Sequence, residues 1–169
     1  DEKRRLQTRF IGAHWAPSVL AAVATARALG ATWDACADAL ACLEPFPGRL
    51  GTLRLPNGAN LLRDEYNGSF ASFEAALVVL EEARCRRRII AIGHIRDTPH
   101  FGADGPEEVG RRSAGVGDVL LFWGAFKERY RSAALAVGAN PDSVVLFDTQ
   151  PEMAEYIRRE TGDGDLILL

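Results

Sequence analysis

The stretch Arg88-Ile89-Ile90-Ala91-Ile92-Gly93 decides the fold, because it opens a series of short, continuous apolar runs. The later runs are VLLF at 119–122, VVLF at 144–147 and LILL at 166–169. Apolar runs of this length, without alternating polar residues, are typical of strands buried on both faces of a sheet. Helix-length segments separate the runs, so the strands should be parallel and joined by crossovers. We predict an α/β fold in which helices flank a Rossmann-like, mostly parallel sheet.

The segments around these runs carry turn and helix signals. Pro56-Asn57-Gly58 favours the positive backbone angles of a tight β-hairpin turn. Ser69 can cap a helix that runs to about Arg84. Pro106 precedes two glutamates in a first helical turn, and Thr149-Gln150-Pro151-Glu152 has the pattern of a capping box with proline just inside. In such a sheet, ligands are expected at the carboxyl ends of the strands.

The first 46 residues have a different character. An alanine-rich helical pattern covers 17–43 and breaks at Gly30-Ala31-Thr32, which predicts a hairpin of two helices. The prolines of Glu44-Pro45-Phe46-Pro47-Gly48 then rule out a continued helix. We therefore expect a domain boundary here, with a helical segment over 1–46 and an α/β domain over 47–169.

Composition limits the class of function. The chain has 169 residues, of which 47% are hydrophobic and 25% charged, as in ordinary globular proteins. A formal net charge of -3 argues against a nucleic-acid partner, because such surfaces need an excess of lysine and arginine. The basic run Arg84-Cys85-Arg86-Arg87-Arg88 should cap helix carbonyls and solvate a turn rather than bind a polyanion.

The cysteines Cys36, Cys42 and Cys85 lack the paired spacing of a zinc knuckle, so they are expected to be reduced core residues. No apolar run approaches the roughly 20 residues needed to span a bilayer. The charged start Asp1-Glu2-Lys3-Arg4-Arg5 is not followed by a signal-peptide core. We therefore expect a cytoplasmic protein with no membrane partner.

Two short motifs point to nucleotide chemistry. Pro47-Gly48-Arg49 places a guanidinium at the expected domain junction, where it can make bidentate bonds to phosphate oxygens. Asp64-Glu65-Tyr66-Asn67-Gly68 follows the hairpin, and its aspartate can accept hydrogen bonds from ribose hydroxyls. The chain nevertheless contains no glycine-rich loop ending in Lys-Ser or Lys-Thr to hold a triphosphate. It therefore looks like one part of a larger ATP-using protein.

In their order and spacing, these motifs resemble the Mur ligase family, over nearly the whole chain. Gly12-Ala13-His14 leading into Leu20-Ala21-Ala22 is similar to the segment that closes the family's central ATPase domain. Pro47-Gly48-Arg49 and Asp64-Glu65-Tyr66-Asn67-Gly68 are similar to motifs that open the C-terminal domain. The last strand is similar to one that continues further in the family. The resemblance thus implies a piece of a longer enzyme.

The resemblance implies an amide ligase in which ATP phosphorylates a carboxylate and an incoming amine attacks the acyl phosphate. Residues 1–46 would end the central domain, and 47–169 would be a C-terminal domain that is not active alone. The ATP-binding residues would be Arg49, Asp64, Asn67 and His14, and the amine substrate would meet His94, Arg96 and Asp97. Mg²⁺ would be held mainly by the central domain. The partners would be a UDP-muramoyl peptide and an amino acid or dipeptide, as in peptidoglycan precursor synthesis.

Each site residue also has a structural interpretation. Arg49 could pair with Glu44 or solvent, and Asp64 and Asn67 could simply cap the turn into the next helix. His14 could be a packing or capping residue. His94 and His100 flank a loop with several acids, but a loop fixes no ligand geometry, so no metal site is expected.

The chain departs from the family pattern at several positions. Arg63 replaces the first of two adjacent acids, while Trp15 and Ser18 replace two asparagines, the second of which faces adenine in the family. These departures keep a second function open, a non-catalytic Mur-ligase-like binding or assembly module. A related ligase, such as folylpolyglutamate or cyanophycin synthetase, is a third possibility.

Overall fold

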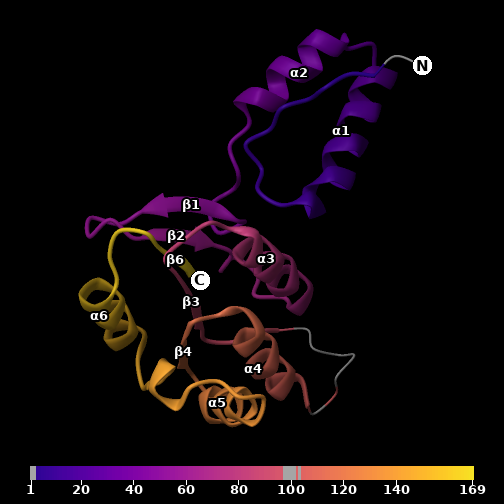
Figure 1. Cartoon of the computed structure of the whole chain (residues 1–169). Coiled ribbons are helices and arrows are strands. Elements are labelled where there is room, and N and C mark those ends of the chain that lie inside the picture. The colour runs from indigo at the N-terminus through magenta and orange to yellow at the C-terminus, as the bar shows by residue number, and fades with distance from the viewer. Residues whose placement is uncertain (1–2, 97–101, 103) are drawn as a thin grey trace.

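The structure is a computed structural model that describes residues 3–96, 102 and 104–169. Figure 1 shows two units. A pair of helices, α1 (Ala16–Ala28) and α2 (Trp33–Cys42), stands apart from a larger body built of strands and helices. The stretch of chain after α2 connects the units, while the stretch before α1 begins at the N-terminus beside the helical pair. The predicted helical hairpin is confirmed, with the Thr32 hydroxyl capping α2 by accepting from the Ala35 amide.

The larger body contains one six-stranded sheet, and its strand order is β1-β2-β6-β3-β4-β5. The hairpin strand β1 is antiparallel to β2, and all the other neighbouring pairs are parallel. The strands are β1 (Gly51–Arg54), β2 (Asn60–Arg63), β3 (Arg87–Ile92), β4 (Val119–Trp123), β5 (Val144–Phe147) and β6 (Asp165–Leu168). The mostly parallel α/β sheet predicted from the apolar runs is therefore confirmed.

Helices cover both faces of this sheet. One face packs against α3 (Phe70–Glu82), α4 (Gly105–Val116) and α5 (Lys127–Ala136), while the other packs against α6 (Gln150–Glu160). Along β3, Ile90 and Ile92 belong to the first core, whereas Ile89 and Ala91 belong to the second. This alternation follows from the two-residue period of a strand. It explains why the strands are apolar throughout.

The predicted helix starts are also confirmed. Ser69 caps α3 by accepting from the Ser72 amide, and Thr149 and Glu152 form the full capping box of α6. Helix α3 ends at Glu82, slightly before the predicted Arg84. Its last turn is closed by Arg88, whose guanidinium donates to the carbonyl oxygens of Leu80 and Glu81.

The hairpin turn differs from its prediction in one respect. Gly58 has a φ of 91°, but Asn57 is not among the residues with positive φ. The Asn57 side chain instead donates to the carbonyl oxygens of Arg158 and Thr161, at 3.2 and 3.0 Å. These bonds tie the turn to the end of α6. The asparagine thus serves a tertiary contact rather than a left-handed backbone.

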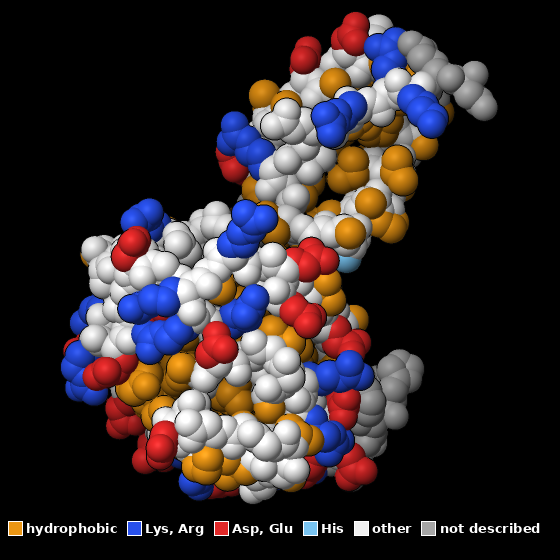
Figure 2. Space-filling view, in the orientation of Figure 1, with side chains coloured by type: hydrophobic (Ala, Val, Ile, Leu, Met, Phe, Trp, Pro, Cys, Tyr) orange, Lys and Arg blue, Asp and Glu red, His pale blue; other side chains and the backbone are white. Residues whose placement is uncertain are grey.

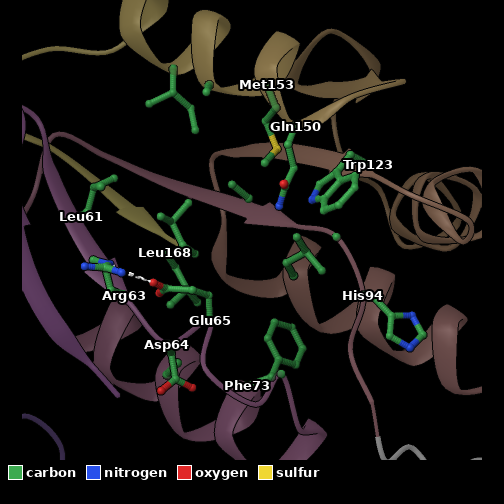
Figure 3. A pocket seen from close by; sticks show the side chains of 18 of the residues that line it. Leu61, Arg63, Asp64, Glu65, Phe73, His94, Trp123, Gln150, Met153 and Leu168 are labelled. Atoms are coloured by element: carbon green, nitrogen blue, oxygen red, sulfur yellow. Dashed lines mark hydrogen bonds and ion pairs between the residues drawn. The ribbon is translucent and has the colours of Figure 1, made fainter. Parts of the chain in front are cut away.

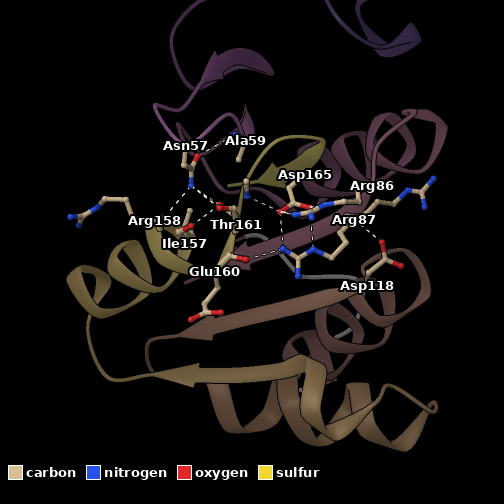
Figure 4. Close-up of polar contacts among 12 residues, drawn as sticks. Asn57, Ala59, Arg86, Arg87, Asp118, Ile157, Arg158, Glu160, Thr161 and Asp165 are labelled. Carbon is tan, nitrogen blue, oxygen red and sulfur yellow. Dashed lines mark hydrogen bonds and ion pairs between the residues drawn. The ribbon is translucent and has the colours of Figure 1, made fainter.

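A buried carboxylate joins two central strands (Figure 4). Asp165, fully buried at the start of β6, lies opposite Arg87 in the register with β3. Its carboxylate accepts hydrogen bonds from Arg86 at 3.0 and 2.8 Å and from Arg87 at 3.0 and 2.7 Å. Burial alone would raise the pKa of Asp165, but the bonds from the two arginines outweigh it and lower the pKa. Two arginines of the basic run, Arg86 and Arg87, therefore stabilise the sheet by pairing with a buried carboxylate.

The helical unit has a much smaller core. Its buried hydrophobic residues are Val23, Cys36 and Leu40, whereas the side chains of Leu20 and Leu29 are 63% and 84% exposed. Figure 2 shows hydrophobic side chains on the outside of this unit and near the waist between the units. The prediction of core cysteines holds for Cys36 but is wrong for Cys42, which is exposed, while Cys85 is half-buried. Among the described residues, no helix is long and apolar enough to cross a membrane.

Candidate functional site

The predicted nucleotide residues gather where β2 ends, at the junction with the helical unit. Asp64 directly follows β2, and the side chains of Arg49 and His14 are close enough to act on its charge. Burial raises the pKa of Asp64, and the Ser72 hydroxyl, the Leu50 amide, Arg49 and His14 each act in the opposite direction. The junction therefore brings together a half-buried carboxylate and two groups that can carry positive charge.

Arg49 is held by an aromatic neighbour. Its guanidinium lies 4.8 Å from the centre of the Tyr66 ring, and the Phe46 ring meets the same tyrosine edge-on at 5.1 Å. Glu44, the alternative partner suggested by the sequence, bonds to Arg9 instead. A cation on an aromatic face keeps its N–H groups available at the ring's edge. Arg49 is thus oriented without being neutralised by the predicted acid.

A strained turn presents this arginine. Leu50 has a φ of 52° and is the one non-glycine residue with positive φ within the described ranges. The left-handed region costs a branched side chain energy, so the surroundings must impose this conformation. The Leu50 side chain is only 2% exposed and belongs to the main core. This conformation cannot be predicted from the sequence, because a leucine gives no local signal of an unusual backbone angle.

The other two residues predicted to bind ATP, His14 and Asn67, are exposed. His14 belongs to a short 3-10 turn, η1 (Ala13–Trp15), and its side chain is exposed. Asn67 is also exposed, in the turn between Asp64 and α3. None of the contacts seen in the described part of the chain joins Asn67 to Arg49 or Asp64. The structure therefore groups Arg49, Asp64 and His14, and leaves Asn67 beside them.

A groove of about 1040 Å³ opens at the carboxyl ends of the strands (Figure 3). Its walls are mostly apolar and come from α3, α6 and the central strands, with Phe73, Met153 and Leu168 among the lining residues. Arg63 and Glu65 form an ion pair at its edge, and Figure 3 shows the Asp64 carboxylate pointing away from that pair. Successive side chains of an extended strand alternate in this way. Asp64 also lines the groove, so the groove reaches the carboxylate of the Arg49 cluster.

The predicted amine-binding residues lie partly in this groove. His94 lines it, and its exposed ring stacks on Phe126 with 5.4 Å between ring centres. Arg96 is exposed, and its backbone pairs with the turn before α3, where the Phe70 amide donates to the Arg96 carbonyl at 3.1 Å. Asp97 lies outside the described residues.

Trp123, whose role was not predicted from the sequence, lines this end of the groove. The Trp123 indole lies so close to Gly93 that a Cβ atom there would stand 2.3 Å from the indole Nε1. Only glycine leaves room for this packing. Gly93 ends one apolar run and Trp123 ends the next, so their adjacency follows from the parallel pairing of β3 with β4. The one sequence signal for this close packing is the glycine that follows the apolar run of β3.

No metal-binding group is evident in residues 3–96, 102 and 104–169. Within these ranges, no three His, Cys, Asp or Glu side chains gather in a way that could hold a metal ion. The charges at the junction, a cation beside a half-buried carboxylate, match a phosphate and a sugar hydroxyl instead. The donor set thus suits a nucleotide better than a bare metal ion.

Comparisons with known proteins support a family assignment. The chain is 27% identical over 157 residues to the UDP-N-acetylmuramoyl-tripeptide--D-alanyl-D-alanine ligase of Synechocystis sp., covering 93% of this chain and 34% of that protein. It is 36% identical over 114 residues to the enzyme of the same name from Escherichia coli, covering 64% of this chain and 24% of that protein. The matched part of the chain therefore spans about a quarter to about a third of the length of these relatives.

The fold of the chain is also similar to that of a solved Mur ligase structure. A crystal structure of MurF from Acinetobacter baumannii superimposes with a TM-score of 0.78 at 22% identity, covering 96% of this chain and 36% of that one. No family model matches the chain. The chain is thus similar in sequence to these Mur ligases, and its fold is consistent with a C-terminal Mur ligase domain.

Proposed function

We propose that this chain is the substrate- and nucleotide-contacting C-terminal domain of an ATP-dependent amide ligase of peptidoglycan precursor synthesis. ATP would phosphorylate a carboxylate of a UDP-muramoyl peptide, and the amine of an amino acid or dipeptide would displace phosphate from the acyl phosphate. The observation that carries the proposal is the cluster of Arg49, Asp64 and His14 at the junction of the two units. Both curated relatives named above are ligases that join D-alanyl-D-alanine to a UDP-muramoyl tripeptide, as their names state.

In this proposal Arg49 contacts the phosphates. A guanidinium bonds well to phosphate oxygens and can stabilise the charge that develops during phosphoryl transfer. Asp64 would face the ribose, with Asn67 and His14 completing the nucleotide side. The sequence has no phosphate loop, so the triphosphate and Mg²⁺ would be held mainly by a separate central domain. The chain alone would then not turn over, because positioning supplies most of this catalysis.

The amine substrate would bind in the groove, near His94, Arg96 and Asp97. His94, Ile95 and Trp123 line this groove at the carboxyl ends of β3 and β4. Ligands of open α/β sheets bind at this edge. The apolar walls would suit the small aliphatic side chains of an alanyl dipeptide.

The division at residue 46 is part of the same proposal. Residues 1–46 would complete a central ATPase domain, and 47–169 would be the C-terminal domain. The exposed side chains of Leu20 and Leu29 support this division, because a helical pair with so small a core gains stability by packing against more protein. The cytoplasmic location expected from the sequence remains a prediction.

Substitution of Arg49 tests the nucleotide role. In the complete gene product, Arg49→Ala should weaken ATP binding about 10- to 100-fold, because a charge-assisted contact to phosphate is lost. The matched control is Arg54→Ala, on the adjacent strand β1, where Arg54 pairs with the exposed Asp163 at 2.9 Å. The control should bind ATP normally, and both variants should melt close to the parent. Equal ATP affinity in all three proteins would refute the role of Arg49.

The experiment also separates the second candidate function. A non-catalytic relative would show no ATP binding and no ligation in the complete gene product. The ion pair between Arg63 and Glu65 is the specific observation that favours this candidate, because Arg63 stands where the family has an acid. ATP binding without transfer to a muramoyl peptide would instead favour a related ligase with another substrate.

A further inference from the structure

Strand β2 ends with an arginine on the groove side of the sheet. Leu61 and Arg63 are two residues apart, so their side chains share one face of the strand. Leu61 is buried in the core beneath α6, and both residues line the groove. The Arg63 guanidinium therefore stands at the edge of an apolar wall, where a charge interacts more strongly with a ligand than in open solvent.

In the part of the sheet that the structure describes, no acid lies beside Arg63 on a neighbouring strand. Its register partner on β1 is Gly51, and a Cβ atom added there would have no neighbouring atom within 4 Å. On the β6 side, the Leu169 amide donates to the Leu62 carbonyl, and the Leu169 carbonyl accepts from the Asp64 amide, both at 3.0 Å. These two bonds place Leu169 beside Arg63. The arginine is thus flanked by a glycine and a leucine.

Glu65 orients Arg63 but leaves part of its guanidinium open. The Nε and Nη2 atoms of Arg63 both donate to the same oxygen, Glu65 Oε1, the first at 2.9 Å. Among the described residues, Nη1 has no hydrogen-bond partner, and the Arg63 side chain is 37% exposed. The edge formed by Nη1 and Nη2 can make two parallel bonds to a carboxylate. Glu65 therefore fixes the guanidinium with this edge still accessible.

Among the described residues that line the groove, Arg158 and His94 can also carry a positive charge. The Arg158 side chain is 69% exposed and pairs with Glu155 at 2.9 Å. The exposed His94 ring stacks on Phe126. Neither residue offers a guanidinium that is fixed against an apolar wall. Arg63 is therefore the group of the groove best suited to a carboxylate.

We propose that Arg63 binds the carboxylate of the incoming amine substrate through this open edge. The substrate class is then an amino acid or peptide with a free carboxylate, and an amine without one is a poor substrate. This inference rests on the proposed function, because it assigns a specificity-determining residue to the amine site. Asp64, the next residue, also lines the groove and lies at the junction of the two units. The amine of a substrate bound at Arg63 can therefore extend towards the acyl phosphate.

Two peptides that differ only at the carboxyl end test this inference. D-Alanyl-D-alanine and its C-terminal carboxamide would be compared as substrates of the complete gene product, with Arg63→Ala and Arg63→Lys as variants. Arg63→Ala should raise the KM for the free acid about 10- to 100-fold with little change in kcat, because a charge-assisted contact is lost from the ground state and the transition state alike. The KM for the carboxamide should change less than about twofold. Arg63→Lys keeps the charge without the planar edge and should lie between the parent and the alanine variant.

The matched control is Arg158→Ala, at the other arginine that lines the groove. It should keep the parent's preference for the free acid. The inference is overturned if Arg63→Ala raises the KM for both peptides equally, because Arg63 would then only maintain the shape of the groove. Loss of the preference in Arg158→Ala, with Arg63→Ala unchanged, would overturn it as well.

Direct binding separates this inference from the proposed function. Each peptide would be titrated calorimetrically against the complete gene product with a non-hydrolysable ATP analogue present, so that no ligation occurs. The parent should bind the free acid at least about tenfold more tightly than the carboxamide, and Arg63→Ala should bind the two alike. A protein that shows this pattern but forms no product would retain the carboxylate site while losing the proposed function. Equal affinities in the parent, or binding of neither peptide, would overturn the role of Arg63 even if product forms.

Discussion

The guanidinium of Arg49 lies over the ring of Tyr66, with 4.8 Å between its central carbon and the ring centre. The two residues come from different motifs, one before β1 and one after β2, and the hairpin brings them together. Tyr66 is 58% exposed, so its ring contributes little to the core. The contact therefore bears on where the arginine points rather than on whether the domain folds.

Replacing Tyr66 should thus affect binding more than stability. Tyr66→Leu removes the aromatic face, and a cation–π contact at an exposed site stabilises by roughly 0.5–1 kcal/mol. The complete gene product should lose about two- to fivefold in ATP affinity, measured by calorimetric titration. Tyr66→Phe keeps the ring and should behave as the parent. Loss of affinity in the phenylalanine variant would assign the role to the hydroxyl instead.

Substitution of the buried Asp165 should lower the stability of the domain. Asp165→Asn leaves Arg86 and Arg87 without a charged partner and should lower the free energy of unfolding by about 3 kcal/mol at neutral pH, measured in urea. Asp163→Asn, two residues earlier, is the matched control, because Asp163 makes an exposed ion pair with Arg54. The control should change stability by less than about 0.5 kcal/mol.

The Asp165 carboxylate should also make the free energy of unfolding depend on pH. The pKa of Asp165 is lower in the folded chain than the ordinary aspartate value of 3.8. Its stabilising contribution is therefore complete above that value and is lost as the pH falls below it towards the folded pKa. Unfolding free energies of the parent should drop over this acid range, and those of Asp165→Asn should drop less. Parallel acid profiles would show that Asp165 does not carry the dependence.

The contribution of Asp64 to stability should change with pH in the opposite direction. Because burial raises its pKa in the folded chain, ionising Asp64 costs stability as the pH rises from 3.8 through the folded pKa. Asp64→Asn removes this cost, so at pH 7 the variant should be at least as stable as the parent. Its advantage should shrink as the pH approaches 4. A variant less stable than the parent at pH 7 would mean that the ionised carboxylate is needed for folding.

The packing of Trp123 on Gly93 can be tested through the amine substrate. Gly93→Ala would place a methyl group 2.3 Å from the indole nitrogen, so the tryptophan must move. Overpacking of this kind costs about 1–3 kcal/mol of stability. We expect a raised KM for the amine substrate and a shifted tryptophan emission. Gly51→Ala, at a glycine with no neighbouring atom within 4 Å of the added Cβ, should change neither.

The sequence predicted the elements well, because their signals are local. The apolar runs located β3, β4, β5 and β6 to within one residue at each end, and the capping residues located the starts of α3 and α6. Sheet type followed from the alternation of strands with helices. What local patterns cannot give is a partner distant in sequence. Arg87 and Asp165 are 78 residues apart, and neither residue type is expected to be buried.

The candidate site was predicted in part for the same reason. Arg49 and Asp64 were singled out by motif, and the structure brings them together. The left-handed Leu50 and the Trp123 indole on Gly93 escaped prediction, because both depend on backbone positions set by tertiary packing. At Asn57 the local element was predicted, but the tertiary role of the side chain was not. Its turn propensity was correctly recognised, but contacts with the end of α6 determine how its side chain is used.

The central claim is tested most directly by ATP-dependent ligation of D-alanyl-D-alanine to the UDP-muramoyl tripeptide. The reaction would be followed by mass spectrometry of the product, with the complete gene product, its Arg49→Ala variant and the 169-residue chain compared. The account predicts product from the complete protein, strongly reduced product from the variant and none from the 169-residue chain. Absence of both product and ATP hydrolysis with the complete protein would contradict it and favour a non-catalytic member of the family.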